Sequence, residues 1–177
     1  MDFAAIDWQR PWLTPFRELG EVLSATPDWI PAANEIARLN DLRNTLDRPI
    51  VFVPQHSLPD AIGYEAHIHA TGEVPSRENL HDFFNALMWL HFGKVKRTLN
   101  QLHVSEIDRL QQQAAWSVQH AQTGIRGRQR DAATLFDENA ALFISSDPSL
   151  IAALRQHEWK RVLLRDPEKF ATDTKVI

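Results

Sequence analysis

The chain has 177 residues, of which 44% are hydrophobic and 24% are charged, and its net charge at pH 7 is −4. This composition is that of an ordinary globular domain and excludes a disordered or collagen-like chain. The small negative charge gives no overall field that attracts nucleic acid or anionic membranes, and the lack of cysteine excludes disulfides, zinc–thiolate sites and a cysteine nucleophile.

The length predicts one domain spanning residues 1–177, because a chain of this size can bury a sizeable core. The N-terminal segment contains Asp2 and Asp7 and is interrupted by Pro11, which is not the pattern of a signal peptide. No apolar run approaches the roughly 18 to 20 residues that a membrane-spanning helix needs. We therefore expect a soluble, cytoplasmic protein that does not associate with membranes.

Two helices and a strand are predicted in the first third of the chain. The segment 14–26 begins with a threonine–proline pair typical of a helix start, and 31–48 has apolar residues at the spacing of one helix face. The run 50–53 is β-branched and aromatic and lies between two prolines. This combination favours a short buried strand.

The segment 64–71 fits two different periods. Tyr64 and Ile68 are four residues apart, as on one face of a helix. Glu65, His67 and His69 would instead share one face of a strand, where they could hold a metal ion. The residues themselves leave both structures open.

A buried helix is predicted at 77–92, with Ser76 as its N-cap, because apolar residues lie almost all round it. A long amphipathic helix is predicted to follow as far as residue 124. Its expected core face includes Val95, Leu99 and Leu102.

The last third is predicted to contain shorter elements. They are an arginine-rich loop at 124–130, a helix at 131–138, a strand at 140–144, a helix at 149–159 and a loose tail from Arg165. The strand at 140–144 could pair with the one at 50–53. The predicted fold class is mainly α, a single helical domain with at most a small two-stranded β element.

One polar constellation lies on segments that otherwise have the pattern of a core. His81, Asp82 and Asn85 crowd one sector of the 77–92 helix next to Trp89. Polar side chains in such a place cost stability unless they find partners. The segment 126–139 supplies candidates, namely Arg128, Arg130, Asp131, Asp137 and Glu138.

The functional interpretation of this constellation is a small-molecule or metal-dependent hydrolytic enzyme. Its catalytic candidates are His81, Asp82, Asp131 and Glu138. Its binding candidates are Asn85, Trp89, Arg128, Arg130 and Asp137, with the arginines clamping an anion. Candidate ligands of a divalent metal ion are His81, Asp82, Asp131 and Asp137.

Two other interpretations stay open. The same residues can form a buried ion-pair network in a non-catalytic interaction module, which could act as a homodimer. Nucleic-acid or phosphate binding would use the arginine-rich loop with Lys94, Lys96 and Arg97, although a solvated helix face explains that run equally well. His103 is expected to be a partly buried histidine and not a ligand. Whether the chain is an enzyme is left undecided.

Three blocks of sequence resemble those of a known family. They are Tyr64-Glu65-x-x-Ile68-x-x-Thr71-Gly72-x-Val74-Pro75-Ser76-Arg77-Glu78-Asn79-Leu80-His81-Asp82-Phe83-Phe84-Asn85-Ala86-Leu87-x-Trp89, then Lys96, Leu99 and Asn100, then Arg130-Asp131-Ala132-Ala133-Thr134-Leu135-Phe136-Asp137-Glu138-Asn139. Over residues 50–159 the chain resembles an uncharacterised bacterial family of unknown function, number 3025.

The resemblance implies a bacterial cytoplasmic protein and a helix at 64–71, and it implies no activity. His67 and His69 lie outside the family pattern, which disfavours a metal site there. Gly93 and Ala140 stand where relatives often carry proline and glycine. Similar chains continue beyond the position of residue 177, so this chain resembles a shortened form.

Overall fold

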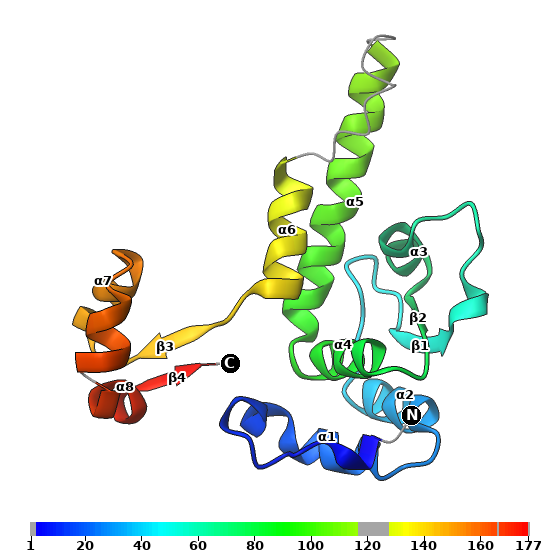
Figure 1. Ribbon diagram of the computed structural model, residues 1–177. Coiled ribbons are helices and arrows are strands. Elements are labelled where there is room, and N and C mark those ends of the chain that lie inside the picture. The colour runs from blue at the N-terminus through cyan, green and yellow to red at the C-terminus, as the bar shows by residue number, and fades with distance from the viewer. Residues whose placement is uncertain (1–2, 117–127, 166, 177) are drawn as a thin grey trace.

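The computed structural model describes residues 3–116, 128–165 and 167–176 (Figure 1). In chain order its elements are η1 (Phe3–Ala5), η2 (Pro11–Phe16), α1 (Arg17–Ser24), α2 (Trp29–Leu39), β1 (Val51–Pro54), η3 (Gln55–Ser57), α3 (Tyr64–Thr71), β2 (Glu73–Ser76), α4 (Leu80–His91), α5 (Gly93–Trp116), α6 (Arg128–Asn139), β3 (Phe143–Ser145), α7 (Pro148–Arg155), a π-helical turn (Arg161–Arg165), α8 (Pro167–Asp173) and β4 (Thr174–Val176). The predicted mainly α fold is confirmed. Within the described ranges, no helix has both the length and the apolar character needed to cross a bilayer.

A small β-α-β unit places α3 over the site described below. β1 and β2 run parallel, with Phe52 beside Val74, and parallel neighbours need a crossover connection, which α3 provides. α3 ends at Gly72, whose φ is +83° and whose added Cβ would lie 2.1 Å from the carbonyl oxygen of Pro49. Only glycine fits this turn, which returns the chain directly into β2. The strand predicted at 50–53 and the helix implied at 64–71 are therefore present.

The core is an aromatic cluster centred on α4. Phe83 is fully buried, stacks on Phe3 with ring centroids 4.7 Å apart, and meets Trp29 edge to face at 5.7 Å. The predicted burial of this helix is confirmed at Phe83 and Trp89. Its N-cap is Asn79, and not Ser76 as the sequence suggested, because Ser76 is the last residue of β2.

α2 is shorter than predicted. It ends at Leu39, because the following backbone turns at Asp41, whose φ is +47°, and the chain then folds round the side chain of Asn44. The Asn44 amide accepts from the backbone N–H groups of Leu46 and Arg48, at 2.9 and 3.0 Å. These bonds replace the helical ones that a continuation to residue 48 would have made.

The buried face of α5 differs from the predicted one. Val95 and Leu102 are 41% and 47% exposed, whereas Lys96, Asn100 and His103 are buried. The helix packs against α3 and α6 with this polar stripe facing inward. Leu99, which was predicted to face the core, does so.

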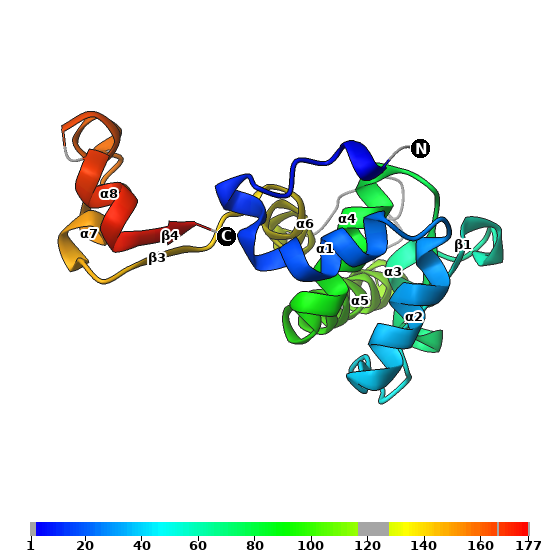
Figure 2. The ribbon, with the colours of Figure 1, turned by 90° about the horizontal axis from the view of Figure 1, so that it is seen from below.

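The last strands and helices form a C-terminal unit, residues 143–176, which lies to one side of the other elements in both views (Figures 1 and 2). β3 pairs antiparallel with β4, and the rings of Phe143 and Phe170 stack at 5.9 Å. The expected pairing between 140–144 and 50–53 is therefore wrong. Residues 167–176, which were expected to be part of a loose tail, form α8 and β4, and the described residues form two small sheets where at most one was predicted.

Acid is expected to weaken the C-terminal unit through Asp147. This residue caps α7 through the Ser149 N–H at 2.8 Å and pairs with Lys169 of α8. The hydrogen bond from Lys169, followed by those from Ser149, lowers the pKa of Asp147 to about 2. Because the pKa is depressed on folding, this stabilisation is complete above the ordinary value near 3.8 and is lost as pH falls toward 2.

The prediction is checked by following the amide NMR signals of residues 143–176 during an acid titration. Asp147→Asn should remove most of the change between pH 4 and 2. Asp173→Asn, at a carboxylate with no ion-pair partner among the residues that the structure describes, is the matched control. An unchanged acid transition in Asp147→Asn would contradict the assignment.

Candidate functional site

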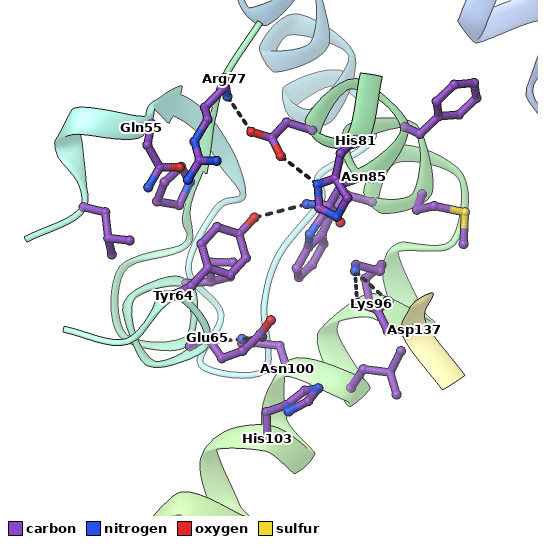
Figure 3. A pocket seen from close by; sticks show the side chains of 18 of the residues that line it. Gln55, Tyr64, Glu65, Arg77, His81, Asn85, Lys96, Asn100, His103 and Asp137 are labelled. Atoms are coloured by element: carbon purple, nitrogen blue, oxygen red, sulfur yellow. Dashed lines mark hydrogen bonds and ion pairs between the residues drawn. The ribbon is translucent and has the colours of Figure 1, made fainter. Parts of the chain in front are cut away.

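A pocket of about 950 Å³ opens between α3, α4, α5 and the end of α6 (Figure 3). This is the size of a cavity that binds a small molecule. Its lining comprises Gln55, Leu58, Tyr64, Glu65, Ile68, Pro75, Arg77, Leu80, His81, Asp82, Phe84, Asn85, Met88, Trp89, Lys96, Leu99, Asn100, His103 and Asp137.

A histidine–aspartate pair lies at the first turn of α4. His81 Nδ1 is 2.8 Å from Asp82 Oδ1, and the other carboxylate oxygen accepts from the backbone N–H of Arg77 at 2.8 Å. The Asp82 N–H in turn donates to Asn79 Oδ1 at 2.7 Å, so the capping of the helix holds the carboxylate in place. Because a carboxylate only accepts, Nδ1 is the donor in this contact, and in the neutral form of the ring this tautomer leaves the lone pair on Nε2.

A tyrosine faces this pair from α3. Asn85 Nδ2 donates to the Tyr64 hydroxyl oxygen at 3.1 Å, and Figure 3 shows the tyrosine pointing from α3 toward Asn85 and His81. Burial raises the pKa of Tyr64, and the nearby carboxylates of Glu65 and Asp82 raise it further. The hydroxyl therefore stays protonated, and its own hydrogen is free to be donated into the pocket.

An ion pair closes the side of the pocket next to α6. Lys96 Nζ lies 2.7 and 2.8 Å from the two carboxylate oxygens of Asp137 and 5.8 Å from the centre of the Trp89 ring. The lysine side chain is 9% exposed and the aspartate side chain 23%. This half-buried pair ties α5 to α6 and places Asp137 in the pocket wall.

The floor of the pocket is formed by Glu65, Asn100 and His103. Asn100 Nδ2 donates to the backbone oxygen of Glu65 at 2.8 Å and to its Oε2 at 2.7 Å. Asn100 Oδ1 and His103 Nδ1 are buried without a hydrogen-bond partner in the described part of the chain.

The structure brings together some of the residues that the sequence singled out. His81, Asp82, Asn85, Trp89 and Asp137 all line the pocket, so side chains from two distant stretches meet beside an open cavity. Asp131 is exposed on α6 and is not part of the lining, because it lies more than one helical turn before Asp137. The side chains of Arg128, Arg130 and Glu138 lie outside the described structure.

Three residues of α5 line the pocket although the sequence did not single them out as site residues. Lys96, Asn100 and His103 recur at offsets of four and three, which is the spacing of one helix face. A polar stripe at that spacing, next to Leu99, indicates a buried polar wall as readily as a solvated one. The burial of Lys96 also breaks up the patch with Lys94 and Arg97 that was considered for phosphate binding.

The side chains considered as metal ligands do not converge in the described residues. No group of three or more histidine and carboxylate side chains is placed to hold a metal ion within that part of the chain. On α3 the helical geometry separates the three candidates: His67 contacts Glu73 at 3.1 Å, His69 contacts Gln101 at 2.9 Å, and Glu65 lines the pocket.

Comparison with known proteins identifies one family. The model of the family described as protein of unknown function (DUF3025) matches residues 50–177, which include every residue that lines the pocket. No curated protein and no solved structure matches the chain. The chain therefore belongs to the DUF3025 family.

Proposed function

We propose that this protein is a hydrolytic enzyme that acts on a small molecule bound in the pocket. The observation that carries the proposal is that a histidine oriented by a carboxylate, His81–Asp82, and a neutral hydroxyl donor, Tyr64, line one cavity. A general base and a hydrogen-bond donor for a developing oxyanion are what the addition of water to a carbonyl group requires.

His81 acts as the general base. With Nδ1–H donating to Asp82, the Nε2 lone pair accepts a proton from a water molecule as its oxygen attacks the substrate. The imidazolium then returns this proton to the leaving group, so the ring ends the cycle as it began. Asp82 holds the ring and stabilises its positive charge.

Tyr64 acts as the oxyanion donor. Its oxygen already accepts from Asn85, so its hydrogen is available for the substrate oxygen that gains negative charge during the attack. Asn85 positions the tyrosine and does not itself need to touch the substrate.

The polar stripe of α5 supports a binding pocket over a purely structural network. Lys96 is satisfied by Asp137, but Asn100 and His103 each keep a buried polar atom without a partner in the described structure. Such atoms lower stability by about 1 to 3 kcal/mol each unless a ligand or an ordered water supplies the missing bond.

The activity is tested by assaying the purified full chain against p-nitrophenyl esters and p-nitroanilides of small acids, with and without an amino group. Release of nitrophenol or nitroaniline above the buffer rate is expected for part of the panel. Tyr64→Phe should lower kcat about a hundredfold, because it removes one oxyanion donor.

The unfolding midpoint and a second hydroxyl variant serve as controls. Ser105→Ala removes an exposed hydroxyl group that, among the described residues, bonds to Gln101 of the same helix, and it should leave kcat unchanged. Full activity in Tyr64→Phe would rule out the assigned role of the tyrosine, and a panel without turnover would count against the hydrolytic class.

A further inference from the structure

The carboxylate at the floor of the pocket is not neutralised by a neighbouring cation. Glu65 accepts from Asn100, and no lysine, arginine or histidine lies within ion-pair distance of it among the residues that the structure describes. Asp137, the carboxylate on the opposite wall, is in contrast fully engaged by Lys96. The floor is therefore the more negative end of this cavity.

Asn100 adds a second acceptor to the floor. Both groups that meet its Nδ2 are oxygens of Glu65, so the amide cannot be turned round without placing two oxygens against each other. Its Oδ1 must therefore face away from Glu65, and it is buried with no donor in the described part of the chain. A group that bonds to this oxygen has to displace the atoms that cover it and has to donate hydrogen.

His103 completes the set. It follows Asn100 by three residues on α5, so both side chains lie on the helix face that lines the pocket. Its buried Nδ1 has no described partner and accepts a hydrogen bond in the tautomer that carries the proton on Nε2.

We propose that Glu65, Asn100 and His103 form a subsite for a protonated primary amino group of the substrate. An ammonium group has three N–H donors and a positive charge, which match two neutral acceptors and one carboxylate. The proposal rests on the proposed function in that the pocket is taken as the substrate site, but it does not depend on the hydrolytic step. The substrate class is thus a small amine with a carbonyl bond that water can cleave.

The remaining walls agree with such a ligand. The carboxylates of Glu65, Asp82 and Asp137 all contribute to the raised pKa of Tyr64, after the larger effect of burial. Phe84 and Met88, which are only partly buried, supply apolar surface for the rest of the molecule. An anionic ligand would gain nothing from the floor and would be repelled by Glu65.

The subsite is tested with benzylamine and its uncharged counterpart benzyl alcohol, by NMR titration of the full chain. Benzylamine is expected to cause saturable shifts at the amides of Glu65, Asn100 and His103, with an affinity at least tenfold higher than that of benzyl alcohol. Glu65→Gln should weaken benzylamine binding about tenfold, while retaining a carbonyl oxygen that can accept from Asn100.

The matched control is Glu78→Gln, an exposed glutamate that is not part of the pocket lining, which should change the affinity by less than about twofold. Equal binding of the two probes would overturn the proposal. Benzylamine binding that is unaffected by Glu65→Gln would also overturn it. The absence of saturable shifts would overturn it as well, and would indicate that an ordered water occupies the floor.

The outcomes separate this inference from the proposed function. If benzylamine binds but no ester or anilide is hydrolysed, the hydrolytic function is ruled out and the amine subsite is retained. If the protein hydrolyses part of the panel but benzylamine neither binds nor inhibits, the amine subsite is ruled out and the hydrolytic function is retained.

Discussion

Replacing His81 with alanine is expected to lower kcat for hydrolysis about a thousandfold, because the variant loses the group that takes the proton from water. The side chain is 79% exposed, so the free energy of unfolding should change by less than about 0.5 kcal/mol. A loss of rate without a loss of stability is the signature of a catalytic group.

His56→Ala is the matched control, since His56 is exposed and does not line the pocket. It should retain full activity. Asp82→Asn should resemble His81→Ala, because an amide that donates to Nδ1 favours the tautomer with a proton on Nε2. Wild-type rates in His81→Ala would remove the general base from the mechanism.

Replacing Asp137 with asparagine is expected to destabilise the protein by about 3 kcal/mol. The change leaves the Lys96 ammonium buried without its negative partner, and removing one member of a buried pair costs about 3 to 5 kcal/mol. The lower end applies here because the Asp137 side chain is 23% exposed. Urea unfolding followed by circular dichroism measures the loss.

Asp131→Asn makes the same chemical change on the same helix at an exposed residue, and it should cost less than about 0.5 kcal/mol. In the double variant Lys96→Met with Asp137→Asn, the unpaired charge is gone, so part of the lost stability should return. Equal stability of Asp137→Asn and Asp131→Asn would show that the pair is not important for the fold.

Local patterns in the sequence were sufficient to predict several helices and strands. The apolar residues around α4 identified a buried helix, and Phe83 and Trp89 are among its buried residues. The same helix carries His81, Asp82 and Asn85, whose polar character among apolar neighbours singled them out, and all three line the pocket. These inferences succeed because burial and polarity on one helix are local properties.

The remaining features depend on tertiary contacts. The buried face of α5 carries Lys96 and Asn100, whereas Val95 and Leu102 are exposed. This orientation depends on the partners that α3 and α6 supply, which no local pattern reveals. The early end of α2 depends on Asn44, whose amide also reaches the backbone of α3 at 2.8 Å. Strand pairing is equally non-local.

The polar cluster has structural contacts and also lines an open pocket. The Asp82 carboxylate accepts from the backbone N–H of Arg77 and Lys96 pairs with Asp137, and these are contacts that hold segments together. The same contacts leave the free side of His81 and the Tyr64 hydroxyl toward a cavity, which a sealed network would not do. In the proposed mechanism, these contacts hold His81 and Tyr64 in place.

The proposed role of His81 depends most directly on the position of one proton on its ring. A long-range proton–nitrogen NMR spectrum of the histidines, recorded where the ring is neutral, should show His81 with its proton on Nδ1, and Asp82→Asn should shift the proton toward Nε2. A His81 ring with its proton mainly on Nε2 in the wild-type protein, unchanged by Asp82→Asn, would contradict the assignment of His81 as a base oriented by Asp82.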